Sequence, residues 1–136
     1  GGELVDLYLT DPPYNVAYEG KTKDKLTMEN DSWGTDEAFV EFLKEAFSSA
    51  LGVMRPGAAF YIWHAGTQAM NFQRACQECG MQVRQLLIWV KNTFALGRQD
   101  YQWKHEPCLY GWKDGAAHWF KDARNLTTVF EDAYSA

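Results

Sequence analysis

Hydrophobic and polar positions along the chain follow strand-like and helix-like patterns in turn. Leu4–Leu9 is rich in strand-forming residues and is soon followed by two prolines, which cannot continue a central strand. This pattern predicts a buried strand that ends in a turn. Apolar residues then recur at helical spacing from Phe39 to Leu51, after Thr35 as an N-cap and two acids that suit a helix N-terminus.

Three further apolar runs predict strands over residues 58–63, 82–90 and 107–112, the last at or near a sheet edge. A turn is expected at Arg55–Gly57, and a second helix over residues 67–79, with Thr67 as its cap and Gly80 just after its end. Residues 19–34 and 92–105 read as polar loops, and the tail from Gly115 carries weaker signals. Strands alternating with helices indicate an α/β fold with a parallel sheet of about four strands.

Length and composition narrow the class of protein. The chain has 136 residues, of which 46% are hydrophobic, as expected for one packed domain over residues 1–136. No apolar run approaches the roughly 20 residues of a membrane helix, and the N-terminus lacks the features of a signal peptide. Three cysteines give no disulfide framework. A cytoplasmic protein without membrane contacts is therefore expected.

Charge is unevenly distributed. The net charge is −5, yet residues 84–113 hold five Lys or Arg against two Asp or Glu, a local balance of +3. A basic stretch on an acidic protein can meet a polyanion, although charge alone favours ordinary solvated surface.

The tetrad Asp11-Pro12-Pro13-Tyr14 is the strongest chemical signal. Ligands of α/β sheets bind beyond the carboxyl ends of the strands, where Asp11 is predicted to lie. The prolines make the turn stiff and rich in acceptors, because they lack N–H groups. Such a turn could accept both hydrogens of an NH₂ group on a flat ring and release its lone pair for attack on an electrophilic methyl, while Tyr14 stacks on the ring. A simple proline turn is the alternative.

The motif has a specific resemblance. Residues 7–15 resemble the catalytic motif of amino-methyltransferases that act on adenine or cytosine in DNA, and residues 54–63, 87–92, 97–101 and 105–111 resemble site-specific DNA methylases of bacteria and phages. The resemblance implies a Rossmann-like methyltransferase sheet with S-adenosylmethionine as methyl donor, DNA as partner, and Asp11, Pro12, Pro13 and Tyr14 at the site of the target amine.

In the permuted class of this family, the glycine-rich cofactor motif follows the catalytic motif and lies near the C-terminus. No such segment follows Glu131. The expectation is therefore an N-terminal fragment with an incomplete sheet that lacks the cofactor motif. The exposed edges of such a half-sheet could pair in a homodimer.

Several residues outside the tetrad are further candidates. Asp11 and His64, which follows the second predicted strand, are candidates for cofactor contact, although an ordinary hydrogen-bonded histidine would look the same. Cations, amides and aromatics interleave in the second polar loop, which suits contacts to phosphate and an unstacked base. The nucleic-acid-binding candidates there are Arg98, Gln99, Tyr101 and Lys104, with Gln102 and Trp103 beside them.

A zinc site is the main competing interpretation. Cys76-x-x-Cys79 and His105-x-x-Cys108 have the spacing of a four-ligand site. The first pair, however, falls inside a predicted helix, and free cysteine usually packs as a small buried hydrophobe. No metal site is therefore expected.

The best-supported function from sequence is methylation of adenine in DNA, because Asp leads the motif where cytosine enzymes of this type more often have Ser. Methylation of adenine in RNA or of a glutamine amide in protein is the first alternative. A truncated, non-catalytic remnant that binds nucleic acid is the second.

Overall fold

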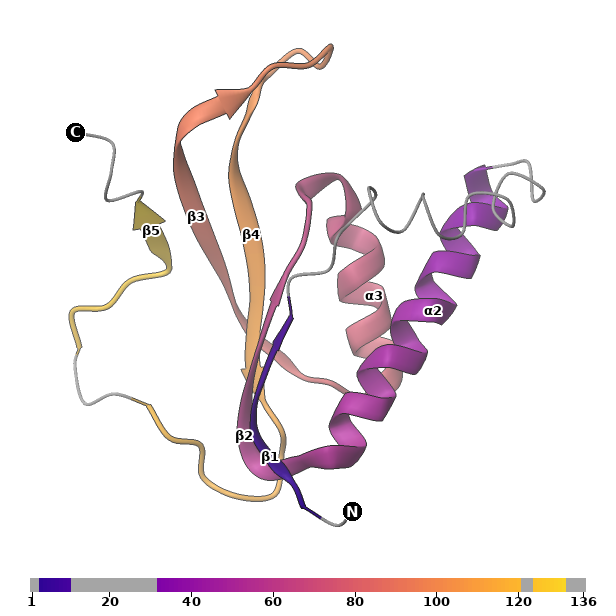
Figure 1. Ribbon diagram of the computed structural model, residues 1–136, viewed down its shortest axis with the longest axis vertical. Helices are drawn as coiled ribbons and strands as arrows, with labels where there is room; N and C mark the ends of the chain where they lie inside the picture. Colours follow the sequence, from indigo (N-terminus) through magenta and orange to yellow (C-terminus); the bar gives the residue numbers. More distant parts are fainter. Residues whose placement is uncertain (1–2, 11–31, 121–123, 132–136) are drawn as a thin grey trace.

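The computed structural model describes residues 3–10, 32–120 and 124–131, which form a five-stranded sheet and two long helices (Figure 1). In chain order the elements are β1 (Val5–Thr10), α2 (Ser32–Val53), β2 (Met54–Trp63), the 3-10 turn η1 (Gly66–Gln68), α3 (Ala69–Cys79), β3 (Val83–Ala95), β4 (Trp103–Trp112) and β5 (Val129–Glu131). The α/β class predicted from the sequence is confirmed.

The sheet is mixed, which corrects the predicted parallel sheet. Its strand order is β1-β2-β4-β3-β5, and β4 runs antiparallel to both of its neighbours, β2 and β3. No helix joins β3 to β4, so the two strands form a hairpin, whose partners are necessarily antiparallel. The predicted edge position of this strand is also wrong: β4 is central, and residues 107–111 are buried.

Element boundaries differ from the predictions in physically simple ways. The turn predicted at Arg55–Gly57 lies inside β2 as a bulge, since Val5 pairs with Met54 but Leu7 pairs with Ala59. Gly57, with φ +87°, donates its N–H to the carbonyl of Lys113 at 2.7 Å. The Lys113 ammonium in turn donates to the carbonyls of Leu51 and Met54, at 2.7 and 2.9 Å, where α2 passes directly into β2. The junction of α2 and β2 is thereby joined to the residue that follows β4.

The two predicted helix caps are wrong, whereas the predicted end of the second helix is confirmed. Thr35 lies within α2, and the segment after β2 begins as η1 before α3, with no side-chain cap from Thr67. Gly80 ends α3 in the left-handed conformation, with φ +88°. The loop predicted over residues 92–105 is shorter, because β3 continues to Ala95 and β4 starts at Trp103.

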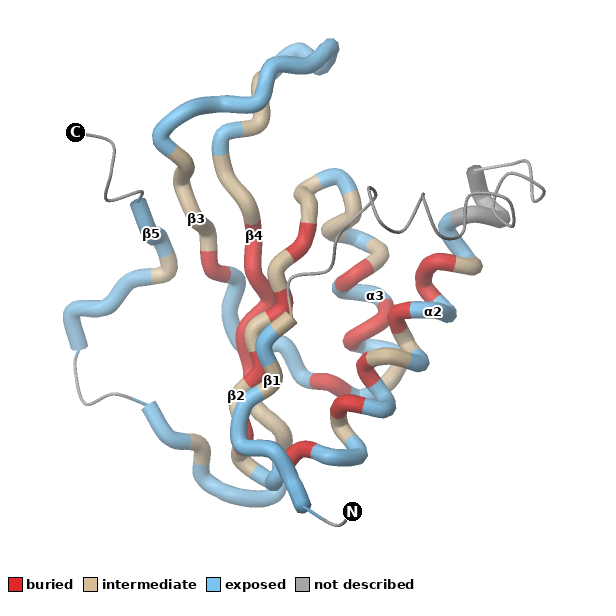
Figure 2. Tube along the Cα trace, viewed as in Figure 1, coloured by how far each residue is buried: buried red, intermediate tan, exposed pale blue. Residues whose placement is uncertain are grey.

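The main core lies between the sheet and the two helices, which cover the same face (Figure 2). Phe60 and Ile62 of β2 point toward the helices, where Phe72 of α3 packs edge-on against Phe39 of α2, with ring centroids 5.8 Å apart. The remaining core residues are Val40, Leu43, Phe47, Ala50, Met54, Ala58, Ala75, Cys76, Met81 and Leu109. Burial of this continuous apolar layer is the dominant stabilising contribution.

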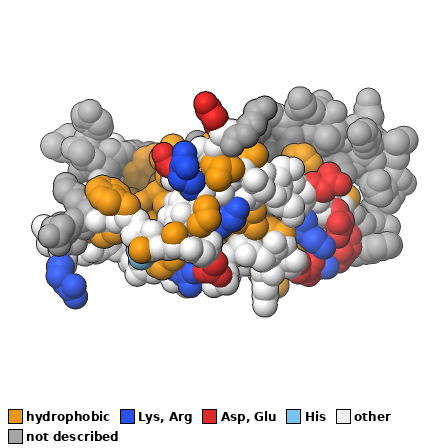
Figure 3. Space-filling model, turned by 90° about the horizontal axis from the view of Figure 1, so that it is seen from below, with side chains coloured by type: hydrophobic (Ala, Val, Ile, Leu, Met, Phe, Trp, Pro, Cys, Tyr) orange, Lys and Arg blue, Asp and Glu red, His pale blue; other side chains and the backbone are white. Residues whose placement is uncertain are grey.

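The other face of the sheet carries a smaller cluster. Leu87, Cys108 and Tyr110 are buried there, and Tyr61 packs beside Tyr110 with ring centroids 5.0 Å apart. On the side of the molecule seen from below in Figure 3, hydrophobic side chains are interspersed with charges of both signs. Neither α2 nor α3 is long and apolar enough to cross a membrane, and the same holds for every other helical segment among the described residues.

Two glycines with positive φ provide a matched test of the corner at Gly57. An added Cβ at Gly57 would lie 2.6 Å from the carbonyl oxygen of Ala117, whereas one at Gly80 would meet nothing within 4 Å. Gly80→Ala should lower the free energy of unfolding by about 1 kcal/mol, from backbone strain alone. Gly57→Ala should lower it by roughly 3 kcal/mol, because a clash with the backbone adds to the same strain. Urea denaturation measures both, and equal losses would contradict the described corner.

Candidate functional site

The strands β1, β2 and β3 run in the same direction, so their carboxyl ends lie at one boundary of the sheet, here called the carboxyl edge. β1 and β2 are parallel, and Thr10, the last residue of β1, pairs with Ile62. β3 has the same direction as β2, because both are antiparallel to β4, so the tip of the β3–β4 hairpin extends beyond this same edge (Figure 1). The tetrad from Asp11 to Tyr14 follows Thr10 directly in the sequence but lies outside the described residues.

His64 lies at this edge, one residue after β2, and is fully buried. Its Nδ1 donates to the carbonyl of Ile62 at 3.2 Å, and its ring stacks on Phe72 with centroids 4.9 Å apart. Its backbone N–H donates to the carbonyl of Pro107. Because Nδ1 carries the proton in this arrangement, Nε2 is left as an acceptor, and it has no partner among the described residues.

Burial also sets the charge of His64. Desolvation lowers the pKa of the imidazole, and the Ile62 carbonyl and the nearby Glu106 carboxylate offset this only in part. The ring is therefore neutral near pH 7. A buried acceptor without a donor destabilises the fold by about 1–3 kcal/mol, which makes Nε2 a candidate contact for a ligand N–H or O–H.

The four residues predicted to bind nucleic acid are gathered on the hairpin. Arg98, Gln99 and Tyr101 lie in the loop between β3 and β4, and Lys104 is the second residue of β4. All four are exposed, and Tyr101 exposes 90% of its surface. Neither Arg98 nor Lys104 forms an ion pair with any residue in the described ranges. The hairpin therefore presents two uncompensated cations.

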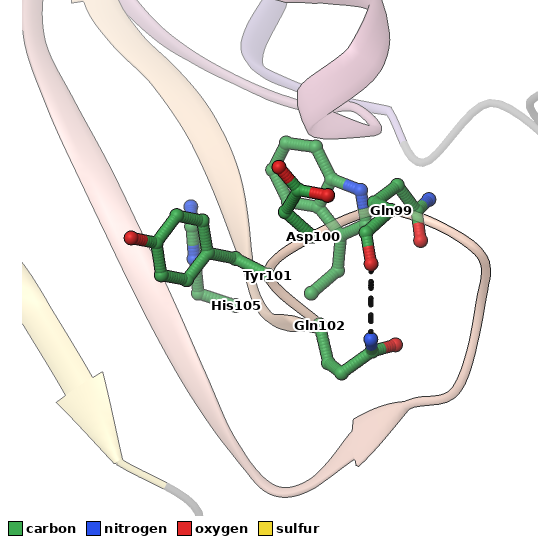
Figure 4. A pocket seen from close by; sticks show the side chains of 6 residues that line it. Gln99, Asp100, Tyr101, Gln102 and His105 are labelled. Atoms are coloured by element: carbon green, nitrogen blue, oxygen red, sulfur yellow. Dashed lines mark hydrogen bonds between the residues drawn. The ribbon is translucent and has the colours of Figure 1, made fainter.

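A pocket of about 400 Å³ opens at the same hairpin (Figure 4). Its lining consists of Gln99, Asp100, Tyr101, Gln102, Trp103 and His105. Asp100 was not predicted to bind a ligand, and His105 was considered only as part of a zinc site. The available signal was period-2 alternation in β4, which places Trp103 and His105 on one face of the strand.

The β3–β4 hairpin contacts the segment that follows β2 through Trp103. A Cβ at Gly66 in η1 would collide with the Trp103 ring, so the absence of a side chain there allows close contact between η1 and β4. Gly66 is two residues from His64 in the sequence. The structure thus connects the hairpin to the segment that carries His64. Of the four exposed hairpin candidates, Gln99 and Tyr101 line the pocket, whereas Arg98 and Lys104 do not.

The cysteines do not form a cluster with metal-binding character. Cys76 is buried in α3 and Cys108 in β4, and burial raises the pKa of each thiol to about 12. Both are therefore neutral thiols, which are poor metal ligands. In residues 3–10, 32–120 and 124–131, no group of three or more His, Cys, Asp or Glu could hold a metal ion.

The buried state of His64 predicts a pH dependence of stability. An unfolded histidine titrates near pH 6.5, and the pKa of folded His64 is lower, so only the unfolded chain binds the proton between these values. Stability should therefore fall as the pH drops below about 6.5. His64→Gln should make the free energy of unfolding less dependent on pH between pH 6.5 and 5. Thr67→Ala changes an exposed side chain and keeps the imidazole, so it should leave this dependence unaltered. Urea denaturation across this range measures the slope; an unaltered slope in His64→Gln would refute the assignment.

Comparisons with known proteins give the family. The chain resembles the solved structure of M1.HpyAVI, with a TM-score of 0.63, 18% identity, and coverage of 98% of this chain and 60% of that one. It also resembles TTHA0409 from Thermus thermophilus, assigned as a DNA modification methylase, with a TM-score of 0.61, 18% identity, and coverage of 94% and 59%. The chain thus spans about three fifths of these structures, and at this identity the likeness concerns the fold.

No curated protein in the comparison matches the chain. The family model described as DNA methylase, which covers N6 and N4 methyltransferases, matches residues 5–134 and therefore nearly the whole chain. On this evidence the chain belongs to the N6/N4 DNA methylase family.

Proposed function

We propose that the chain carries the target-base site of a methyltransferase that moves a methyl group from S-adenosylmethionine to the exocyclic amino group of adenine in DNA. The observation that carries the proposal is the register of β1. This strand runs parallel to β2 and ends at Thr10, beside Ile62, immediately before the tetrad. Because Asp11 follows Thr10 directly in the sequence, we expect it near the carboxyl end of β1, where α/β proteins bind ligands.

The tetrad offers the chemistry that such a transfer needs. The amine of a base is a poor nucleophile, because its lone pair is delocalised into the ring. Asp11 and a backbone carbonyl near Pro12 would accept its two hydrogens and localise the lone pair on nitrogen, while Tyr14 would stack on the ring. Attack on the methyl group would form the N–C bond and break the methyl–sulfur bond, which leaves a neutral thioether. The excess proton on nitrogen would pass to Asp11 or to water. A target in duplex DNA must first be flipped out of the stack, which costs about a few kcal/mol.

The proposed donor also fits one feature of the described residues. S-adenosylmethionine, when bound, supplies an electrophilic methyl on sulfur. M1.HpyAVI and TTHA0409 have both been solved as complexes with it. In this chain, the buried Nε2 of His64 is an acceptor without a donor at the same edge, and an amino or hydroxyl group of an adenosine would satisfy it. We therefore assign His64, together with Asp11, to contact with the cofactor.

The hairpin is proposed as the nucleic-acid contact. Arg98 and Lys104 flank its tip and would meet phosphates, whereas Gln99 and Tyr101 offer an amide and an exposed ring to a base. Adenine is proposed as the acceptor rather than cytosine, because Asp is the first residue of the tetrad. RNA adenine and a protein glutamine amide are alternative acceptors, and a non-catalytic chain that only binds nucleic acid is the alternative without turnover.

Asp11→Asn tests the catalytic assignment. The substitution keeps the size of the side chain but removes its charge and one acceptor oxygen, so methyl transfer should fall by about 100-fold or more. Asp6→Asn is the matched control, because Asp6 lies near the start of β1, away from its carboxyl end, and pairs with Arg55. The assay uses the protein that contains the chain with any neighbouring sequence of its gene.

Mass spectrometry of nucleosides from DNA and RNA, and of glutamine-containing peptides, identifies the product. N6-methyladenine in DNA is the expected product. Detection of N4-methylcytosine, methylated RNA or methylated glutamine would show that a different acceptor is the substrate. Wild-type activity in Asp11→Asn would overturn the role of the tetrad.

The salt dependence of oligonucleotide affinity tests whether the hairpin contacts nucleic acid. Arg98→Gln and Lys104→Gln should each reduce the slope of log affinity against log salt by about 0.7 for a single-stranded oligonucleotide, because each removes one phosphate contact. Lys44→Gln is the control, since Lys44 on α2 already pairs with Glu41 and Glu78. Fluorescence anisotropy at several salt concentrations gives the slopes. Equal slopes for all four proteins would place the nucleic acid elsewhere.

A further inference from the structure

We propose that the outer side of β1 binds a second copy of the chain, whose β1 pairs with it antiparallel about a two-fold axis at Leu7. The inference concerns assembly and does not depend on the proposed function. The observations that carry it are the position of β1 in the sheet, the exposure of its apolar residues and the symmetry of its sequence.

β1 is an outer strand with an unpaired side. The strand order is β1-β2-β4-β3-β5, and no strand among the described residues pairs with the side of β1 that faces away from β2. The unpaired N–H and C=O groups of an outer strand are a template for another strand. β1 has six residues, whereas β5, at the opposite end of the sheet, has only three. β1 is therefore the longer of the two outer strands.

One face of β1 is apolar and exposed (Figure 2). Val5, Leu7 and Leu9 expose 39, 52 and 63% of their surface. They alternate with Tyr8, which packs against the helical core, so they lie on the opposite face of the sheet, where Leu9 pairs with Tyr61. A solvent-facing strand normally carries polar residues at such positions. Contact with a second copy would remove this apolar surface from water.

β1 lacks the features that usually protect an outer strand from another chain. Outer strands are commonly protected by Lys or Pro, which hinder the approach of a further strand. Val5–Thr10 contains neither. Its one charged residue, Asp6, is paired with Arg55, with Oδ1 and Nε 2.6 Å apart. The strand therefore presents no uncompensated charge that would repel another copy.

The sequence of β1 is self-complementary. In an antiparallel pair, residues directly opposite each other lie on the same face of the sheet. A register with Leu7 opposite Leu7 of the second copy places Val5 opposite Leu9 on both sides of the axis. Three apolar pairs then form on one face, as expected for an interface that uses the same surface of both subunits.

Neighbouring registers are less favourable. With Val5 opposite Leu7, the two copies of Asp6 would lie directly opposite each other, and such like-charge pairs are destabilising. With Tyr8 opposite Tyr8, two apolar pairs form on the exposed face in place of three. A slip by one residue would set the apolar face of one copy against the helix-covered face of the other. The register centred on Leu7 is therefore the expected one.

The proposed dimer would contain two separate sites. The paired strands run in opposite directions, so their carboxyl ends lie at opposite boundaries of the joined sheet. Thr10 is three residues from the axis, which separates the two copies of Thr10 by about 20 Å along the strand direction. Each copy would keep its own carboxyl edge and its own hairpin.

Analytical ultracentrifugation of the 136-residue chain at increasing concentration tests the proposal. The wild type should form a dimer. Leu7→Lys should raise the dissociation constant of the dimer about tenfold or more, because two ammonium groups would replace an apolar pair at the axis. Val129→Lys is the matched control, since Val129 is 46% exposed on the opposite outer strand, and it should leave the dissociation constant unchanged.

Cysteine cross-linking tests the register without an added charge. The Cα atoms of directly opposite residues are about 4.5–5.5 Å apart, a spacing that a disulfide can bridge. Leu7→Cys should therefore yield a covalent dimer under mild oxidation. Val129→Cys should not, and the wild type, oxidised in parallel, measures any cross-linking through Cys79, which is partly buried.

A chain that stays monomeric at every concentration would overturn the proposal. If the β1 amides of that monomer are protected from hydrogen exchange, other residues of the same chain cover the strand. A dimer that Leu7→Lys does not weaken, or that Leu7→Cys does not cross-link, would have its interface elsewhere and would also contradict the proposal. None of these measurements needs a methyl donor, so this inference and the proposed function can fail separately.

Discussion

The antiparallel pairing of β4 between β2 and β3 is the constraint on which the arrangement of the site depends. Tyr61 pairs with Tyr110 on one side of β4, and Leu87 pairs with Cys108 on the other. This insertion gives β3 the direction of β1 and β2, so the hairpin tip, His64 and the end of β1 all lie at one edge. If β4 were an outer strand, β2 and β3 would lose their shared partner, and the hairpin would no longer be held beside η1. Burial of Leu109 and Cys108 on opposite faces fixes the strand in this central position.

The sequence predicted the elements better than their connections. Apolar runs identified the four longer strands and both helices, because strand-forming residues are concentrated in the strands and apolar residues recur at helical spacing in the helices, although no residue of β1 is buried. The apolar runs did not identify strand direction, because a buried parallel strand and a buried central antiparallel strand have the same composition. The available sign was the absence of a helical pattern between residues 92 and 105, which makes a hairpin the simplest connection. β5 escaped prediction because its three residues are all exposed and carry no alternation.

The positions of the candidate residues were predictable where they depend on chain order and unpredictable where they depend on contacts. The position of His64 at a strand end follows from the apolar run before it, and the carboxyl edge follows from the order strand, helix, strand. The orphaned Nε2 of His64 does not, because it results from a contact with Ile62 and burial against Phe72. Asp100 was visible only as part of a charge balance, and its place in a pocket depends on how Gln102 folds the loop.

The acidic net charge is compatible with a nucleic-acid partner because a group of the acids is paired on the helical layer, whereas two cations without ion-pair partners in the described ranges lie on the hairpin. On the helical layer, Arg74 bonds both Glu37 and Glu78, and these bonds lower the pKa of each carboxyl, so the acids there stay ionised and paired. Lys44 joins the same network through Glu41 and Glu78. Opposite charges at such short range largely cancel beyond the Debye length of about 8 Å at physiological salt. A phosphate strand that approaches the hairpin would instead meet Arg98 and Lys104, which have no ion-pair partner in the described ranges.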